Sequence, residues 1–308
     1  MRPFPPFASV LKSRDVEDVV NLWLHRPLAY VFARLVYPTP LTPNQVTLLA
    51  MLVGIASGVA WAIGTPEMMV AGGILLWSSA ILDGVDGILA RAKQMYTDLG
   101  RALDGAADSV VVFASVAGGF YHLWRDHPDT LSYTMVLLCI VSAVLHTHLY
   151  DFYKESYMHS LNPEFDGRFQ TEGDLAQRLQ ELKGEAGHWT AKVATDMTRG
   201  LVRNQTALVR VLDPDGSRAG LQFTGGEQTA AIYRKHNRRV VKAWSYISLA
   251  PHAYCFSICG MVDRLDIYVW IRVVPMNVMF LVIQLWQRRA STATRHELTA
   301  AGLAPTPL

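Results

Sequence analysis

The sequence predicts an all-α, polytopic membrane protein, and three observations support this: its composition, its long apolar runs and the placement of its basic residues. Of the 308 residues, 51% are hydrophobic and only 18% are charged, against about 25% charged residues in typical soluble domains. Mean hydropathy is +0.17, although a long polar segment separates the apolar runs. A net charge of +2, without a basic run interleaved with aromatic residues, argues against nucleic acid as a partner.

The first expected element is an amphipathic helix in the N-terminal segment, residues 1–40. The stretch VVNLWLHRPLAYVFARLVY mixes apolar residues with His25, Arg26 and Arg34, and Pro27 interrupts it. This mixture favours a helix that lies along the membrane surface. A short buried helix in a soluble cap is the alternative interpretation.

Six apolar windows approach the length of about 20 residues that a membrane-spanning helix needs. They cover approximately residues 46–64, 67–90, 101–122, 131–150, 241–262 and 266–287. Pro43 and Asn44 mark the start of the first window, because proline fits only the first turn of a helix. We therefore expect spans one to four within residues 41–154 and spans five and six within 239–290.

The basic residues predict the orientation of these spans. With the N-terminus in the cytoplasm, Arg125 and Arg264 lie in outer loops and Arg272 lies inside the last helix, while all other Lys and Arg residues fall on the inner side. The opposite orientation would invert this bias. Both chain ends, including the tail at 291–308, are therefore expected to be cytoplasmic.

A polar segment at residues 155–238 separates the fourth and fifth windows. Apolar residues recur in it at helical spacing, and LDPDGSRAG at 212–220 is typical of a turn. We expect a cytoplasmic helical insertion with a regulatory or partner-binding role. Its apolar positions are Val193, Met197, Leu201, Leu208, Val209 and Leu212.

Four aspartates stand where the second and third windows approach each other, in LDGVDGILARAKQMYTDLGRALDGAADS (82–109). Asp83 and Asp86 are three residues apart, and Asp104 and Asp108 are four apart, so each pair shares one helix face. The short turn at 92–99 makes the two helices antiparallel neighbours. All four carboxylates can then converge at the inner membrane surface.

Four ionised carboxylates at one place must be protonated, paired with bases or gathered around cations. Arg91 and Lys93 are too few to neutralise them. Oxygen-only ligands favour Mg²⁺, Mn²⁺ or Ca²⁺ over zinc, and two divalent ions would balance the charge. Paired divalent ions of this kind serve phosphoryl and phosphodiester chemistry. Small residues such as Gly84 and Gly105 leave room for a ligand or a second helix.

Written as a pattern, the segment is Asp83-x2-Asp86-Gly87-x2-Ala90-Arg91-x8-Gly100-x3-Asp104-x3-Asp108. This pattern resembles the signature of the CDP-alcohol phosphotransferase family of membrane enzymes, and no position of that signature is missing. A chance match to so many fixed positions is rare. The six spans and PNQVT at 43–47 also resemble the family. The likeness covers the membrane region and does not extend to the insertion.

The resemblance implies transfer of a substituted phosphate from a CDP-linked donor to an alcohol, with release of CMP. It implies that Asp83, Asp86 and Asp104 bind two divalent ions, Mg²⁺ or Mn²⁺, and that Asp108 is the general base and a possible metal ligand. The family pattern places four residues along the CDP moiety: Gly87, Ala90, Arg91 and Gly100. Two weaker candidates for the nucleotide pocket are Asn44 and Thr47. Family members resemble one another in forming homodimers.

The motif leaves the substrates open. The preferred hypothesis is that CDP-diacylglycerol is the donor and a small polar alcohol the acceptor, in phospholipid biosynthesis. The reason is that the acidic cluster is expected to face the cytoplasm, where polar acceptors are dissolved. A CDP-linked polar alcohol, with a lipid or polyol acceptor, is the alternative within the family. An ion- or proton-coupled transporter is the alternative from another class, although the sequence lacks the inverted repeats typical of transporters.

Polar residues of the last three windows are candidates for reading the acceptor. Lys154, Arg264 and Arg272 are the ones retained, although each alone is more often an interfacial anchor. A zinc or iron site at His146, His148 and Asp151 is disfavoured, because no third histidine follows at helical spacing.

Overall fold

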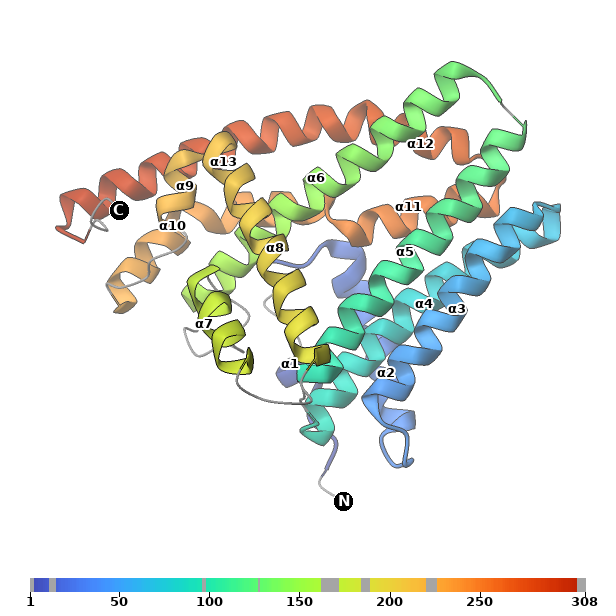
Figure 1. Cartoon of the computed structure of the whole chain (residues 1–308), viewed down its shortest axis with the longest axis horizontal. Coiled ribbons are helices and arrows are strands. Elements are labelled where there is room, and N and C mark those ends of the chain that lie inside the picture. Colours follow the sequence, from blue (N-terminus) through green and yellow to red (C-terminus); the bar gives the residue numbers. More distant parts are fainter. Residues whose placement is uncertain are drawn as a thin grey trace. The chain divides into compact units, whose positions relative to one another are not determined.

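The computed structural model describes residues 3–10, 15–95, 98–126, 128–161, 172–183, 189–219 and 226–303. All regular secondary structure in these residues is helical (Figure 1). The chain divides into two compact units, each described by itself below. Unit 1 comprises Met1–Ala143 and Leu249–Met276, and unit 2 comprises Val144–Ser248 and Asn277–Leu308.

The helices of unit 1 are α1 (Phe7–Val10), the π-turn η1 (Asn21–His25), α2 (Arg26–Val36), α3 (Pro43–Ile63), α4 (Pro66–Lys93), α5 (Asp98–Asp126), the first part of α6 (Thr130–Leu161), α11 (Leu249–Met261) and α12 (Leu265–Val273). The helices of unit 2 are the remainder of α6, α7 (Glu172–Lys183), α8 (Trp189–Leu212), α9 (Pro214–Ala219), α10 (Gly226–Trp244), the 3₁₀ turn η2 (Ser245–Ile247) and nearly all of α13 (Pro275–Ala300).

Local sequence fixes both ends of α3. The Thr42 hydroxyl accepts the amide of Gln45, and the Gln45 side chain accepts the amide of Thr42, which is a capping box. Pro43 occupies the first helical turn, where its missing N–H costs nothing. The helix ends at Gly64, whose φ of 73° suits a residue without a side chain.

Glycines bring α3 and α5 into backbone contact. A Cβ atom added to Gly58 would overlap the backbone of Ala114, and one added to Gly118 would overlap the backbone of Gly58. Small residues allow membrane helices to approach this closely. The close crossing of α3 and α5 therefore depends on Gly58 and Gly118, and α5 is the helix that carries Asp104 and Asp108.

One tryptophan organises the other end of the α3–α4 hairpin. Trp61 is fully buried, and its indole N–H donates to the carbonyl of Met69 over 3.1 Å. Its ring fills the space left by Gly72 of α4 and Gly260 of α11, and it packs edge-on against Phe256. These contacts fix α4 against α3 and α11.

Five candidate spans of suitable length and composition occur among the described residues. They are Pro43–Ile63, Pro66–Lys93, Leu103–Arg125, Thr130–Leu161 and Leu265–Ala300. They overlap the first four expected windows and the sixth. A multi-pass membrane protein is thus supported, whereas a count of six spans stays a prediction.

The window at 241–262 does not form the continuous helix that its hydropathy suggested. The chain leaves the α10 helix after Trp244, and Ser248 is extended, with a ψ of 177°. The Ser248 hydroxyl donates to the carbonyl of Ser245, three residues earlier. The 13 residues of α11 span about 20 Å, short of a bilayer core of about 30 Å. The last window is also interrupted, at Val274 before Pro275.

The expected N-terminal helix is present as η1 and α2. Ala29 and Ala33 pack on Val85 and Ile88 of α4, and the opposite side of the helix exposes apolar side chains. These exposed residues are Trp23, Leu24, Leu28, Val31, Phe32 and Leu35. An apolar outer face agrees with a helix at the membrane surface, which stays a prediction.

Unit 2 is held together by buried polar contacts centred on Asp213. Its carboxylate accepts the hydroxyls of Tyr153 and Ser291 over 3.0 and 2.6 Å and the amide of Gly216 over 3.0 Å. Burial raises the pKa of Asp213 above its usual value. These contacts connect α6, α9 and α13. The segment for which the sequence predicted a turn forms the short helix α9 over Pro214–Ala219.

Candidate metal and phosphate site

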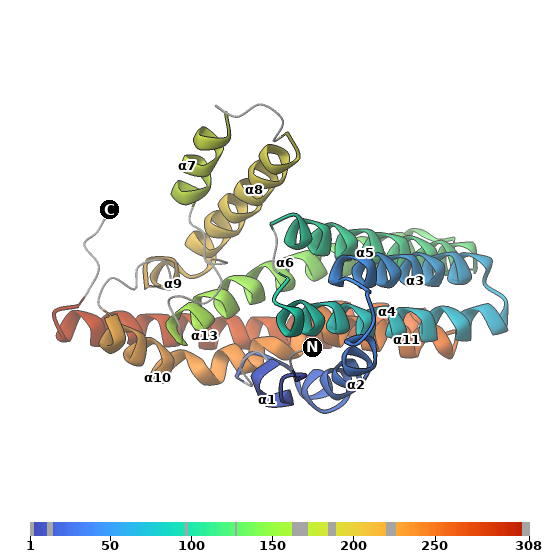
Figure 2. The same cartoon turned by 90° about the horizontal axis from the view of Figure 1, so that it is seen from below.

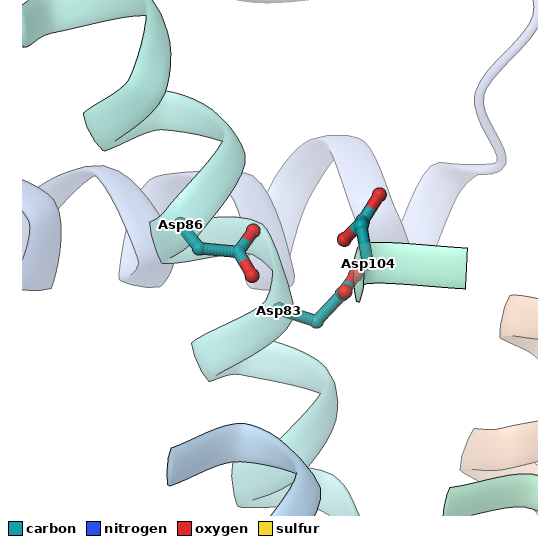
Figure 3. A group of neighbouring side chains, drawn as sticks. All are labelled: Asp83, Asp86 and Asp104. Carbon is teal, nitrogen blue, oxygen red and sulfur yellow. The ribbon is translucent and has the colours of Figure 1, made fainter. Parts of the chain in front are cut away.

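Three of the four motif aspartates form one cluster in unit 1. Asp83 and Asp86 project from the last part of α4, and Asp104 projects from the beginning of α5 (Figure 3). One carboxylate oxygen from each lies within 4.8 Å of the others. Asp83 is exposed, Asp104 is half-buried and Asp86 is buried, so the cluster opens to solvent on one side.

The fourth aspartate, Asp108, lies beside this cluster. It is one turn after Asp104 on the same face of α5, and its exposed carboxyl is within hydrogen-bonding reach of Asp83. It is also close enough to interact electrostatically with Asp86 and Asp104. The convergence that helical spacing predicted for all four residues therefore holds.

Thr47 of α3 supports the buried aspartate. Its hydroxyl donates to Oδ2 of Asp86 over 2.5 Å, and both side chains are buried. Three helices therefore build the cluster: α4 and α5 supply the carboxylates, and α3 orients one of them.

The charge of the cluster fits divalent cations. Two carboxylates separated by 4.8 Å repel each other by about 3 kcal/mol at an effective dielectric constant of about 20. The cluster contains several such pairs, and within the described part of the chain no other group of three or more acidic, His or Cys side chains could hold a metal ion. An all-carboxylate donor set matches Mg²⁺ or Mn²⁺. Asp83, Asp86 and Asp104 are thus suited to hold them.

The glycine of the motif provides space for the arginine. A Cβ atom added to Gly87 would lie 3.7 Å from both terminal nitrogens of Arg91. The guanidinium therefore folds back over Gly87, which is one helical turn before Arg91. A guanidinium at this place can donate a planar fork of hydrogen bonds to a phosphate. On the other side of α4, a Cβ atom added to Gly84 would lie 3.0 Å from the methyl group of Ala29, so this glycine allows α2 to pack closely there.

Residues 40–172 match the family model described as CDP-alcohol phosphatidyltransferase. The match spans α3 to α6 and includes every residue of the aspartate motif. This part of the chain is a CDP-alcohol phosphatidyltransferase domain. The resemblance inferred from the motif is confirmed.

Three curated relatives match parts of the chain, and each is described as "Bifunctional IPC transferase and DIPP synthase". The protein of Aquifex aeolicus is 34% identical over 119 residues, which are 38% of this chain and 26% of the relative. That of Thermococcus kodakarensis is 34% identical over 106 residues, 34% of this chain and 22% of the relative. That of Archaeoglobus fulgidus is 31% identical over 123 residues, which are 40% of this chain and 23% of the relative. The similarity thus involves about a quarter of the length of each relative.

The remaining nucleotide candidates of the CDP-alcohol phosphatidyltransferase domain lie near the ends of its helices. Asn44 is half-buried in the first turn of α3, one turn before Thr47. Ala90 is half-buried in the last turns of α4. Gly100 lies in the first turn of α5, one turn before Asp104.

Arg264, one of the three acceptor candidates, belongs to the same unit as the aspartates. Arg264 pairs with Asp266 over 2.8 Å, and its neighbour Asp263 contacts His122. His122 is 18 residues beyond Asp104 on α5, a distance of about 27 Å along the helix. Arg264 therefore marks the end of unit 1 opposite the cluster.

Arg272 and Lys154 have protein partners of their own. Arg272 is fully buried on α12, and its Nη1 lies 2.6 Å from Nε2 of His252 on α11. Lys154 belongs to unit 2 and pairs with Asp151 on the same helix. His148 of the disfavoured metal site lies 2.8 Å from the carbonyl of Val144 through Nδ1. Each of these side chains therefore has a partner within its own unit, and a role in acceptor binding stays a prediction.

Proposed function

We propose that the protein transfers a substituted phosphate from a CDP-linked donor to the hydroxyl of an alcohol, releasing CMP. The observation that carries the proposal is the cluster of Asp83, Asp86 and Asp104, whose carboxylates meet within 4.8 Å in the order of the family signature. The domain match at residues 40–172 supports the same reaction class. The short shared length with the relatives leaves the activity of the whole chain as a proposal.

In the proposed mechanism Asp83, Asp86 and Asp104 hold two divalent ions, Mg²⁺ or Mn²⁺. Such ions, when bound, neutralise a diphosphate and stabilise the charge that develops on the leaving phosphate. Asp108 accepts the proton of the acceptor hydroxyl. The acceptor oxygen then forms a bond to the phosphorus distal to cytidine, the bond from that phosphorus to the bridging oxygen breaks, and CMP leaves with the electron pair.

Arg91 is assigned to the phosphates of the donor. Its guanidinium lies over Gly87 on the helix that carries Asp83 and Asp86, so arginine and carboxylates can engage opposite sides of one diphosphate. Ala90 and Gly100 are assigned to the CDP moiety, together with Asn44. Thr47, a weaker nucleotide candidate by the family pattern, is assigned the positioning of Asp86 because its hydroxyl donates to that carboxylate.

CDP-diacylglycerol is the donor that we propose first, with a small polar acceptor. The aspartates lie near the ends of candidate spans, where a bilayer can present a diacylglycerol chain and the aqueous phase can supply the acceptor. A CDP-linked polar alcohol is the second candidate, because the three relatives are named transferase and synthase without reference to a phospholipid. We further propose that the protein is a homodimer in the lipid bilayer and that its active site faces the cytoplasm.

Release of CMP by the purified full-length protein tests this proposal. CDP-diacylglycerol and CDP-linked polar alcohols are offered separately, each with Mg²⁺ and a panel of alcohols, and CMP is quantified. Asp129→Asn is the matched control, because Asp129 caps α6 through Ser132 and is not part of the cluster. CMP formation with either donor class supports a transferase and identifies the donor. No CMP with any pair, together with ion flux in proteoliposomes, would favour the transporter alternative.

A further inference from the structure

Helix α8 of unit 2 carries an apolar stripe that the described chain leaves exposed. Trp189, Val193, Met197 and Leu201 follow one another at intervals of four residues, so they lie along one side of the helix. Their exposed fractions range from 48% to 70%. Helix α7 packs against α8 and its Leu175 is buried, but this contact does not cover the stripe. A stripe of this size indicates an interaction surface.

Basic residues line one flank of this stripe. Lys192, Arg199, Arg203 and Arg210 are separated by seven, four and seven residues, which places all four on a single side of α8. Asp196 is the one acidic residue within the helix, and Arg199 also contacts Glu172 of α7 at 3.5 Å. An apolar face with a terminal tryptophan and a basic edge is typical of helices that lie in a lipid headgroup layer.

The far end of α8 is anchored to helices that enter the membrane. The side chain of Gln205 donates to the carbonyl of His148 on α6 over 2.7 Å, and Gln284 of α13 donates to the carbonyl of Leu212 over 3.1 Å. His148 and Gln284 belong to two of the candidate spans, Thr130–Leu161 and Leu265–Ala300. The C-terminal half of α8 is therefore tied to two helices that contain candidate membrane spans.

The direction of α8 suits a helix in the membrane plane. In both views α8 runs across the direction of α13, with which it shares unit 2 (Figures 1 and 2). A helix that crosses the direction of a candidate span can lie along a membrane surface. The N-terminal half of α8 can then rest on the membrane surface.

We propose that α8 is an interfacial helix whose stripe inserts among the headgroups of an anionic leaflet, with its basic flank on lipid phosphates. A second copy of this chain is disfavoured as the occupant, because an antiparallel two-fold contact between two α8 stripes would bring the two basic flanks together. The surface would attach the insertion to the membrane. The inference is independent of the proposed reaction.

Spin labels on the full-length protein in lipid nanodiscs test this proposal. Single labels are placed by Val193→Cys and Met197→Cys on the stripe and by Gln180→Cys on the exposed side of α7; unsubstituted protein serves as the labelling blank for its native cysteines. Collision with oxygen reports lipid, and collision with a water-soluble nickel chelate reports solvent. We expect the two stripe labels to favour oxygen and the Gln180→Cys label to favour nickel.

The charge contribution is tested by lipid composition. Nanodiscs of phosphatidylcholine alone are compared with a phosphatidylcholine and phosphatidylglycerol mixture at low salt. Each cation near an anionic surface strengthens attachment by about fivefold, so Arg203→Gln with Arg210→Gln should shift the attached population by about 25-fold. Equal depth of the stripe labels in both lipids would overturn the assignment of an anionic surface.

Two further outcomes would reject a membrane partner. Stripe labels as accessible to nickel as the Gln180→Cys label would show that the stripe stays in water. Labels shielded from both oxygen and nickel would show that protein covers it, and spin–spin broadening would then identify a second copy.

Discussion

Replacing Thr47 by valine removes one hydroxyl from the acidic cluster and preserves the shape of the side chain. In the intact protein this hydroxyl donates to Oδ2 of Asp86 over 2.5 Å. Both side chains are 5% exposed, so water cannot easily supply the missing donor. The variant therefore tests whether α3 contributes to the cluster by orienting Asp86.

The size of the effect follows from the charge and burial of Asp86. A hydrogen bond to a charged group contributes about 1.5–3 kcal/mol, which corresponds to a factor of about 10 to 150 in an equilibrium constant. Loss of an outer partner of a metal ligand lowers metal affinity or activity by about 10–100-fold. We expect Thr47→Val to weaken the apparent affinity for Mg²⁺ by about 10–100-fold on these grounds.

The assay is CMP release at saturating donor, measured as a function of Mg²⁺ concentration. Thr47→Ser keeps a hydroxyl and should restore most of the Mg²⁺ affinity. Ser79→Ala is the matched control, because the Ser79 hydroxyl also connects α4 to α3, one turn before Asp83, but donates to the carbonyl of Ala50 at 2.7 Å rather than to a carboxylate. An unchanged Mg²⁺ dependence in Thr47→Val would refute a positioning role for Thr47.

Four further predictions concern the cluster and the fold. Asp104→Asn should abolish high-affinity Mn²⁺ binding, detected by the loss of free-ion signal in electron paramagnetic resonance, and retained binding would argue against its role as a ligand. Asp108→Asn should lower turnover far more than donor binding, whereas an equal loss of both would indicate a ligand role alone. Gly118→Ala places a methyl group on the backbone of α3 and should lower stability in detergent by about 1–3 kcal/mol, whereas Gly200→Ala, with open space around it, should not. Burial lowers the pKa of His25 to about 4, so the unfolded chain binds a proton more readily than the folded protein does. The free energy of unfolding should therefore fall by about 1.4 kcal/mol per pH unit as the pH is lowered from 6.5 to 4. His25→Phe should flatten this slope.

The aspartate cluster could be predicted from the sequence because its geometry is local. Asp83 and Asp86 share a helix face by their spacing, as do Asp104 and Asp108, and a short connection forces the two helices to be neighbours. The partner of Asp86 could not be predicted in this way. Thr47 is 39 residues earlier, and only the packing of α3 on α4 brings its hydroxyl to the carboxylate.

Hydropathy located most of the apolar helices but not their interruptions. The window at 241–262 is apolar in composition, yet the chain breaks at Ser248, where an extended residue separates α10 from α11. The helix break before Pro275 carried a visible signal, since proline cannot continue the helical hydrogen bonds. The surroundings of the acceptor candidates could not be predicted in this way, because sequence spacing does not encode long-range contacts such as the one between the buried Arg272 and His252.

Formation of CMP from a CDP-linked donor, with and without Mg²⁺, tests the central claim most directly. The wild-type protein should release CMP only when Mg²⁺ or Mn²⁺ is present, and Asp83→Asn should release none, while Asp129→Asn behaves as wild type. CMP release that persists in Asp83→Asn, or that survives complete chelation of divalent ions, would contradict a reaction centred on the carboxylates of α4 and α5.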